Sequence, residues 1–176
     1  DSLTRSPKKV FTVAITGPNC AGKTTAAKWL TDNLERRRIA STMFSVDSYL
    51  RHRRLRTGLP GEGEDYYQRG FDVDRLPGGV AALKLQLAGE PSERDHIIVE
   101  GVFLLRDQMS GDWDISFWLD IDDEEMLEQG VRRGVGYFGS EECASLVYRS
   151  RMIPAQQLHR RRVNPETRAS VIYDAS

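Results

Sequence analysis

Val10-Phe-Thr-Val-Ala-Ile-Thr16, followed by Gly17-Pro-Asn-Cys-Ala-Gly-Lys-Thr24, is the stretch of sequence that decides the fold. Its first part is a short, continuous, β-prone apolar run, which is typical of a strand buried on both faces of a parallel sheet. From Lys23 to about Arg37, apolar residues recur at helical spacing among charged ones, so an amphipathic helix is predicted there. A strand, a glycine-bearing turn and a helix in this order open a βαβ unit.

The turn itself matches the P-loop pattern of Gly, four residues, Gly, Lys and Ser or Thr. Backbone N–H groups of such a loop converge on phosphate oxygens, and the start of the helix adds to that field. Lys23 is predicted to contact the β- and γ-phosphates of ATP, and the Thr24 hydroxyl to bind Mg²⁺. The alternative is an ordinary glycine-rich turn that caps a helix. The predicted nucleotide-binding residues are Gly17, Asn19, Ala21, Gly22, Lys23, Thr24 and Thr25.

The alternation of strand and helix patterns continues through the chain. The predicted elements are strands at 42–46, 96–99, 115–121 and 169–173 and helices at 78–88 and 122–133. This alternation predicts an α/β fold with a mostly parallel central sheet and helices on both sides. Four glycines between residues 130 and 139 are expected to loosen the chain before a further helical stretch around Cys143. The connector at 48–76 is long and lacks periodicity, so we expect it to be functional.

Composition and charge exclude several classes of protein. The 176 residues fit one domain, and 25 Lys and Arg against 26 Asp and Glu give a formal net charge of −1. Such a chain has no bulk field to recruit nucleic acid or a membrane, so neither is expected as a partner. No apolar run approaches the roughly 20 residues that cross a bilayer, and residues 1–9 lack a signal-peptide pattern. A cytoplasmic protein is predicted. Cys20 and Cys143 fit no metal spacing, which argues against a zinc site.

Carboxylates follow several predicted strands at the point where each strand ends. Asp47 and Glu100 each come directly after such a strand. Because the ligand of a parallel α/β sheet lies beyond the carboxyl ends of its strands, both are expected to face one crevice with the P-loop. We predict Asp47 as the base that contacts the acceptor hydroxyl and Glu100 as a ligand of Mg²⁺, directly or through water. A helix cap or a surface acid is the competing interpretation of each, and the preferred one for Asp120 and Asp122.

Arginines gather in the last third of the chain. Residues 132–168 contain eight arginines and three glutamates. A mobile basic helical segment can close over the transferring phosphoryl group, neutralise its charge and exclude water. We therefore predict a lid at about 132–152, whereas 160–162 are assigned to the surface. A solvated charged face or a nucleic-acid patch would give the same composition. The lid candidates are Arg132, Arg133, Arg149 and Arg151, of which Arg132, Arg133 and Arg151 are assigned catalytic roles.

The long connector carries residues suited to an acceptor pocket. Aromatic faces and a carboxylate are what a sugar or nucleobase pocket uses, and Tyr66, Tyr67, Phe71 and Asp72 supply both. Packing of the connector on the sheet explains the aromatic residues equally well. Asp72 is the better candidate for binding a hydroxyl, because a charged residue between apolar neighbours needs a partner if buried. A basic cluster near Asp47 either contacts acceptor or phosphate or is a solvated loop; it comprises Arg51, Arg53, Arg54 and Arg56.

Several of these blocks occur together in one family. Gly17 to Thr24, Val46-Asp47-Ser48-Tyr49, Phe71-Asp72, Ile97-Ile98-Val99-Glu100-Gly101 and the stretch from Tyr148 to Leu158 resemble the uridine kinase and phosphoribulokinase group, especially a short bacterial uridine kinase-like branch. The resemblance implies an adenylate-kinase-like three-layer P-loop NTPase fold with a helical lid, and ATP with Mg²⁺ as donor. It further implies Asp47 as base, Asp72 as a ligand of the acceptor's sugar and an arginine-bearing lid. The predicted acceptor-binding residues are Asp47, Tyr49, Tyr67, Phe71, Asp72 and Glu100.

The predicted function is transfer of the ATP γ-phosphoryl group to a hydroxyl of a small molecule, with the 5′-hydroxyl of uridine or cytidine as the favoured acceptor. A kinase for another metabolite, such as pantothenate, nicotinamide riboside or a sugar phosphate, shares the same donor site. A nucleotide-binding switch without transferase activity is the alternative from another class. The chain has no Asn-Lys-x-Asp guanine signature, which argues against a GTPase.

Overall fold

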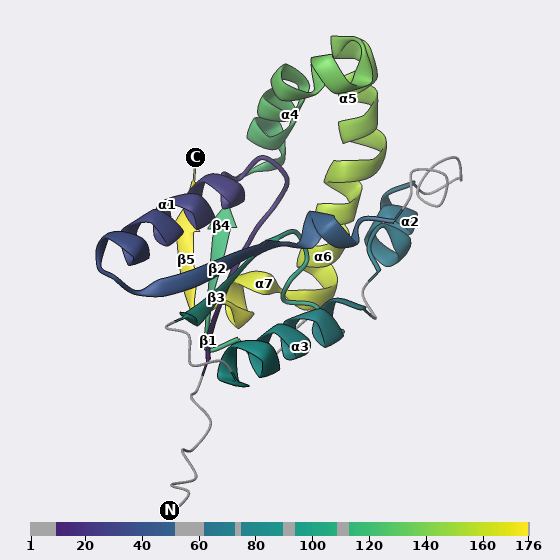
Figure 1. Ribbon diagram of the computed structural model, residues 1–176. Coiled ribbons are helices and arrows are strands. Elements are labelled where there is room, and N and C mark those ends of the chain that lie inside the picture. Colours follow the sequence, from purple (N-terminus) through teal and green to yellow (C-terminus); the bar gives the residue numbers. More distant parts are fainter. Residues whose placement is uncertain (1–9, 52–61, 73–74, 90–93, 109–112, 176) are drawn as a thin grey trace, which may run out of the picture.

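The computed structural model describes residues 10–51, 62–72, 75–89, 94–108 and 113–175. Over these ranges the chain forms a five-stranded parallel sheet in the order β2-β3-β1-β4-β5 (Figure 1). The strands are β1 (Phe11–Thr16), β2 (Ala40–Ser45), β3 (Arg94–Gly101), β4 (Ile115–Asp120) and β5 (Val171–Asp174). The helical elements are α1 (Lys23–Arg36), the 3₁₀ turn η1 (Val46–Tyr49), α2 (Glu62–Arg69), α3 (Arg75–Gly89), α4 (Asp123–Phe138), α5 (Glu141–Val147), the π-helical segment η3 (Tyr148–Met152), α6 (Ile153–Val163) and α7 (Pro165–Arg168).

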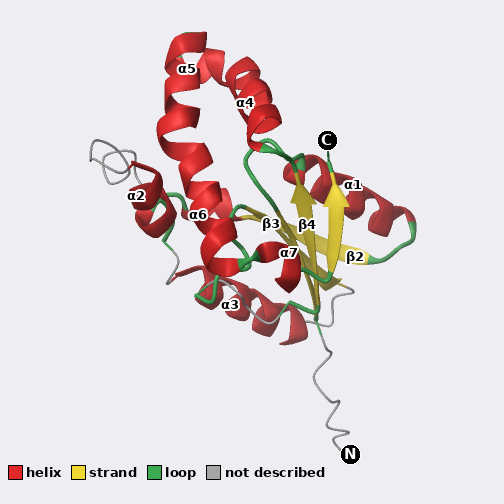
Figure 2. Cartoon of the chain, turned by 180° about the vertical axis from the view of Figure 1, so that it is seen from behind, coloured by secondary structure: helices red, strands yellow, loops and turns green. Residues whose placement is uncertain are grey.

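Helices cover both faces of the sheet, and the alternation of side chains along β1 shows why (Figure 2). Val13 and Ile15 point to one face, where they pack in a cluster with Ala27 of α1. Ala14 points to the other face and packs in a cluster that includes Leu76 of α3 and residues of α2 and α6. The predicted three-layer α/β fold with a parallel central sheet is therefore confirmed. Within the described residues, no helix has the length and apolarity that a membrane crossing requires.

The register of the sheet sets the carboxyl ends of three strands side by side. Glu100 of β3 lies opposite Ile15 of β1 on one side and opposite Ser45 of β2 on the other. The loop that begins at Gly17 and the turn that carries Asp47 therefore flank Glu100. A site formed by these three segments is a direct consequence of the strand order.

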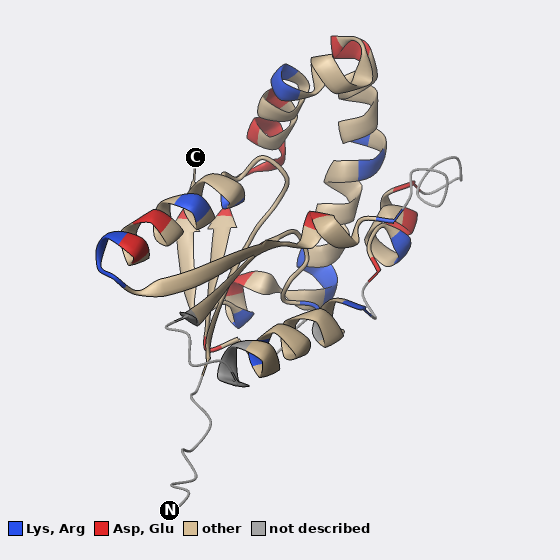
Figure 3. Ribbon diagram, in the orientation of Figure 1, with Lys and Arg blue, Asp and Glu red and all other residues tan. Residues whose placement is uncertain are grey.

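The glycines after Val131 do not loosen the chain, contrary to the prediction. Helix α4 runs through them to Phe138 and ends at Gly139, whose φ of 96° provides the left-handed cap. Gly130 and Gly134 are buried inside the helix, and a Cβ at Gly130 would lie 2.2 Å from the Tyr148 ring. Gly130 therefore lets η3 approach α4 closely. The basic residues of α4 lie toward its far end and the acidic ones at its start (Figure 3).

The connector at 48–76 contains a helix that the sequence analysis missed. Helix α2 packs against α6 so closely that a Cβ on Gly63 would lie 2.5 Å from the Cβ of Pro154. Its sequence contains a glycine and three acids, which gave no helical signal; its buried face exists because α6 covers it. Of the basic cluster in this connector, Arg53, Arg54 and Arg56 lie outside the described residues.

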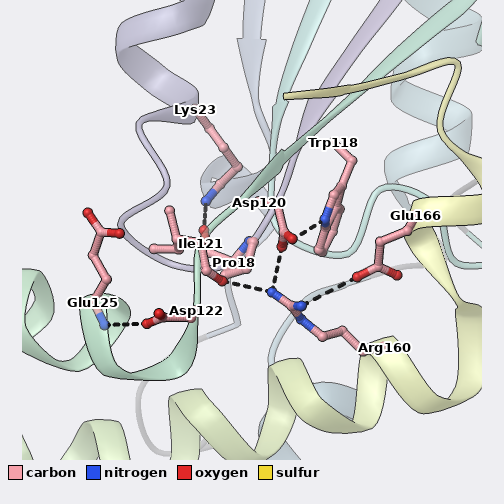
Figure 4. A network of polar contacts seen from close by, with 9 residues as sticks. All are labelled: Pro18, Lys23, Trp118, Asp120, Ile121, Asp122, Glu125, Arg160 and Glu166. Carbon is pink, nitrogen blue, oxygen red and sulfur yellow. Dashed lines mark hydrogen bonds and ion pairs between the residues drawn. The ribbon is translucent and has the colours of Figure 1, made fainter. Parts of the chain in front are cut away.

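Arg160 is not the free surface residue that was predicted. Its guanidinium donates to the Asp120 carboxylate at 2.7 Å and to the Ile121 carbonyl at 2.8 Å, and it lies 3.4 Å from Glu166 (Figure 4). Asp120 thus serves as an ion-pair partner at the end of β4 rather than as a cap. Asp122 does cap α4, because its carboxylate accepts a hydrogen bond from the Glu125 amide at 2.7 Å. Arg160 fixes α6 to the end of β4.

His159 of α6 lies in the core with its ring against those of Tyr67, Phe103 and Trp118. Burial, together with the charges of neighbouring arginines, lowers the pKa of its imidazole to about 3. The folded chain therefore keeps this ring neutral where the unfolded chain, with an ordinary pKa of 6.5, would protonate it. A neutral ring among other rings is the form that this part of the core accepts.

The buried imidazole predicts a specific acid sensitivity. Its stabilising contribution is complete above pH 6.5 and falls as the pH drops toward 3, by up to about 1.4 kcal/mol per pH unit. His159→Phe keeps the ring and removes the titration. We expect the free energy of unfolding, measured by urea denaturation, to fall less in His159→Phe than in the wild type between about pH 6 and pH 4. Equal acid dependence in the two proteins would contradict the assignment.

Candidate active site

The phosphate-binding loop has the backbone shape that its glycines permit. Gly17 has a φ of 155°, and a Cβ there would lie 2.2 Å from the Leu119 carbonyl oxygen. Gly22 has a φ of 78° and forms the N-cap of α1, so the first amides of the helix face the loop. Only glycine fits the first position without displacing β4, and it suits the second because of the left-handed φ. The strand, loop and helix that the sequence predicted are in place.

A cavity of about 540 Å³ lies at the carboxyl ends of the strands, between the phosphate loop and α4. Three groups of residues form it: the loop with the start of α1, the ends of β2 and β3, and the predicted lid. Its lining is Asn19, Cys20, Gly22, Lys23, Thr24, Thr25, Asp47, Glu100, Gly101, Val102, Arg133, Gly134, Tyr137, Phe138 and Tyr148. We call this cavity the phosphate cavity.

Lys23 is buried at the base of the phosphate cavity. Its ammonium donates a hydrogen bond to the Pro18 carbonyl of its own loop (Figure 4). Burial lowers the pKa of Lys23 to about 8, and the charge of Glu100 opposes that shift only in part. A cation held in a place that disfavours its charge gains most from an incoming anion. The residue is therefore well placed to receive phosphate oxygens.

The lowered pKa of Lys23 predicts how nucleotide affinity depends on pH. Phosphate favours the charged ammonium, so binding above pH 8 must be accompanied by uptake of a proton. We expect the affinity for a non-hydrolysable ATP analogue to be nearly constant below pH 8 and to fall above it by up to about tenfold per pH unit. Titration calorimetry in buffers of different ionisation enthalpy measures the proton directly. Binding without proton uptake at about pH 9 would contradict the role of Lys23.

Thr24 and Glu100 form an oxygen-rich pair in the phosphate cavity. The Thr24 hydroxyl donates to the Glu100 carboxylate at 3.2 Å, and Glu100 is only 4% exposed. Hydroxyl and carboxylate oxygens are the donors that Mg²⁺ prefers, and this ion is usually held by one or two carboxylates with phosphates and water completing its shell. Within the described residues no group of three or more His, Cys, Asp or Glu side chains could hold a metal alone. The pair fits Mg²⁺ that arrives with a nucleotide.

Asp47 lies in the phosphate cavity with its side chain exposed to solvent. It belongs to η1, whose first turn is capped by the Ser45 hydroxyl accepting from the Asp47 amide at 3.3 Å. Val46 fixes this turn from below, because it fills the space beside Gly101, where a Cβ would lie 1.8 Å from the Val46 Cγ1. The carboxylate is therefore held on a rigid turn beside Glu100, at the open side of the cavity.

The predicted lid arginines have different surroundings. Arg133 lines the phosphate cavity from α4, whereas Arg132 is exposed and lines none of it. Arg151 is 8% exposed and pairs with Glu62 of α2 at 3.3 Å, away from the cavity lining. The structure thus brings Arg133 to the phosphate cavity and holds Arg151 on α2.

The predicted acceptor-binding residues separate into three groups, of which the first, Asp47 and Glu100, lines the phosphate cavity. Tyr49 and Asp72 line a second cavity of about 330 Å³ with Phe44, Ser48 and Arg75. Asp72 lies 3.6 Å from Arg51. Tyr67 and Phe71 are 4% and 1% exposed and pack on Phe103, so they lie in the core and line neither cavity. Their packing is the alternative that the sequence analysis left open for these aromatic residues.

Comparison with known proteins adds sequence relatives and structural neighbours. No family model matches the chain. Uridine kinases from several strains of Streptococcus pyogenes are 27% identical over 148 residues, which covers 72% of this chain and 69% of theirs. A protein from Bacillus stearothermophilus described as a possible uridine kinase shares the fold, with a TM-score of 0.72 and 22% identity over 98% of this chain and 92% of that one. The chain is thus similar in sequence to these uridine kinases and shares the fold of the Bacillus stearothermophilus protein.

A second structural neighbour broadens the range of functions on this fold. A Silicibacter protein described as a fructose transport system kinase superposes with a TM-score of 0.76 at 20% identity, over 97% of this chain and 92% of that one. At such identities the likeness concerns the fold. The chain therefore shares its architecture with proteins named for different acceptors.

Several residues of the candidate site escaped the sequence analysis. Tyr137, Phe138 and Tyr148 line the phosphate cavity from the predicted lid. Cys20, to which no role was assigned from the sequence, lies with its Sγ 3.4 Å from the Tyr148 hydroxyl. The aromatic residues near the four glycines were the signal that could have predicted them. A helix with small residues on one face can pack against bulky rings from a neighbouring helix. A third cavity also escaped notice, since its walls come from α1 and from the end of β5.

Proposed function

We propose that the chain transfers the γ-phosphoryl group of ATP to a hydroxyl of a small molecule, with the 5′-hydroxyl of uridine or cytidine as the favoured acceptor. The observation that carries this proposal is the meeting of Lys23, the Thr24–Glu100 pair and Asp47 in one cavity of about 540 Å³. The first three groups suit a phosphate chain with Mg²⁺, and the fourth suits the hydroxyl that attacks it. An exposed carboxylate at that point can accept the proton of an attacking hydroxyl, which is the group that a transferase requires there.

The donor would extend from the phosphate cavity into the third cavity. That cavity has a volume of about 620 Å³ and shares Gly22 and Thr25 with the phosphate cavity. Its walls include Trp29, Tyr173 and Leu119, which offer the apolar and aromatic surface that a purine base needs. A nucleotide with its phosphates on the loop can therefore place its base against these side chains. We expect the phosphates of ATP in the phosphate cavity and its adenine base in the third cavity.

The proposed mechanism assigns each step to a residue of this chain. The Asp47 carboxylate orients the acceptor hydroxyl and takes its proton as the oxygen attacks the γ-phosphorus. A new O–P bond forms while the bond to the β-phosphate oxygen breaks, and ADP leaves. Lys23 and Arg133 stabilise the charge on the phosphate oxygens. Mg²⁺, held by Thr24 and Glu100, would supply further charge neutralisation.

The predicted lid, residues 132–152, would exclude water during transfer. Its aromatic residues Tyr137 and Phe138 already line the phosphate cavity, and Tyr137 is 70% exposed. An exposed aromatic ring beside a reaction site is available to cover a bound acceptor. Closure would also bring Arg132 nearer to the phosphates, and release of Arg151 from Glu62 would free a further cation.

A nucleoside is favoured as acceptor because the sequence relatives are named uridine kinases. The neighbour described as a fructose transport system kinase makes a sugar derivative the second candidate. Release of ADP from ATP, measured with and without each acceptor, separates the candidates. We expect ADP to form with uridine or cytidine and to stay near background without an acceptor. ADP release that no acceptor stimulates would instead support a nucleotide-driven switch.

A further inference from the structure

A single buried amide connects helix α6 with the phosphate loop. Gln156 of α6 is 0% exposed, and its side-chain nitrogen donates to the Asn19 Oδ1 at 3.0 Å. Asn19 lines the phosphate cavity. The side-chain oxygen of Gln156 has no hydrogen-bond partner within the described part of the chain. The contact with Asn19 is therefore what offsets the cost of burying this amide.

The segment that carries Gln156 is fixed on several sides. Pro154 lies in the first turn of α6 beside Gly63 of α2, while Arg160 donates a hydrogen bond to Asp120 at the end of β4 at 2.7 Å. Gln156 and Arg160 are four residues apart, so they lie on the same face of α6. That face meets the end of β4 and the loop beside it. A donor on so rigid a support can define where Asn19 lies.

A second contact joins the same region to the loop. The Tyr148 hydroxyl lies 3.4 Å from the Cys20 Sγ, and burial raises the pKa of Tyr148, which keeps that hydroxyl protonated. Tyr148 is the first residue of the π-helical segment η3, a type of irregularity that often marks a functional site, and Gln156 lies in α6, which follows it. The consecutive loop residues Asn19 and Cys20 are thus each contacted by a side chain from the continuous η3–α6 stretch.

We propose that Gln156 is a positioning residue for the phosphate loop, which holds Asn19, and through it the loop backbone, in the shape that binds a nucleotide. This inference rests on the proposed use of the loop for ATP. Without the amide donor, the Asn19 side chain loses its fixed partner and the loop must be ordered by the ligand itself. The cost of that ordering is expected in nucleotide affinity rather than in the rate of transfer.

The neighbouring residue provides a matched control. Gln157 is also a glutamine of α6, but it is exposed and donates to Asp123 of α4 at 2.6 Å, away from the loop. Gln156→Met and Gln157→Met each remove a donor while keeping the length of the side chain. Gln156→Leu serves as a second variant of similar volume if Gln156→Met does not fold. Asn19→Ala and the double variant Asn19→Ala with Gln156→Met complete a double-mutant cycle.

The readouts are the Kd for a non-hydrolysable ATP analogue with Mg²⁺, by calorimetry, and the split between KM and kcat with ATP. We expect Gln156→Met to weaken binding and raise the KM by about tenfold with kcat changed less than about twofold, and Gln157→Met to change neither. The double variant should bind no more weakly than the weaker single variant. Unchanged affinity in Gln156→Met, or effects that multiply in the cycle, would overturn the inference.

The same experiment separates the inference from the proposed function. A wild-type protein that binds the analogue but phosphorylates no acceptor would contradict the proposed function. The comparison of Kd between the wild type and Gln156→Met would still test the role of Gln156. A wild-type protein that does not bind the analogue would overturn both. A fall in melting temperature without a change in Kd would assign Gln156 to packing alone and overturn its positioning role.

Discussion

Asp47→Asn is expected to lower kcat by about 10²- to 10⁴-fold, the range that a positioned general base contributes. Asn keeps the size and polarity of the side chain on η1 but cannot take a proton from the acceptor hydroxyl. Asp47 is exposed and is held through its backbone amide, so the substitution should leave the fold unchanged. Steady-state kinetics with ATP and uridine measure the change.

The control for this variant is nucleotide binding. Because Asp47 lies at the open side of the phosphate cavity rather than in the loop, we expect the Kd for an ATP analogue to stay within a few-fold of the wild type. Turnover near the wild-type rate would remove Asp47 from the role of base. Loss of binding with intact fold would mean that the carboxylate serves the donor rather than the acceptor.

Lys23→Met is expected to lower kcat/KM by about 10³-fold or more, because it removes the cation nearest to the phosphate oxygens. It is also expected to leave the protein at least as stable as the wild type. Burial lowers the pKa of Lys23 to about 8, so the folded chain holds a charge at neutral pH that it disfavours. The unfolded chain carries the charged ammonium at no such cost, and it loses the proton only as the pH rises toward 10.5. A methionine removes that penalty while filling the same space.

Thermal unfolding at about pH 7 and at about pH 10 tests this second effect. Since the penalty of the buried charge disappears as the pH rises from 8 toward 10.5, the gain in melting temperature of Lys23→Met over the wild type should shrink at the higher pH. A variant that loses both activity and stability would show that Lys23 supports the fold. Low activity with raised stability is the pattern of a residue kept for function.

The first strand, the loop and α1 could be predicted from sequence because their signals are local. An apolar run, glycines at fixed spacing and an amphipathic pattern lie within residues 10–37, and each matches the structure. The positions of Asp47 and Glu100 could be predicted for a similar reason, because each lies at the end of a predicted strand. Once the sheet is parallel, residues that follow its strands must share one edge.

The features that escaped prediction depend on contacts between distant parts of the chain. One face of helix α2 is buried because α6 covers it, and Gly130 of α4 makes room for the ring of Tyr148 instead of allowing a bend. In the sequence, Arg160 is one of several consecutive arginines and resembles a surface residue; its ion pair with Asp120 depends on where β4 lies in the fold. Tyr67 is of a residue type that often lines binding pockets, but in this fold it is buried in the core. Periodicity and motif spacing do not show which distant residue a given side chain will contact.

Transfer of a label from the γ-position of ATP tests the central claim most directly. The protein is incubated with Mg²⁺, uridine and ATP labelled in the γ-phosphoryl group, and the products are separated. We expect label in uridine 5′-monophosphate in amounts equal to the ADP formed, and a rate of labelling that is about 10²- to 10⁴-fold lower with Asp47→Asn. Label that is released only as inorganic phosphate, at the same rate with and without uridine, would contradict it.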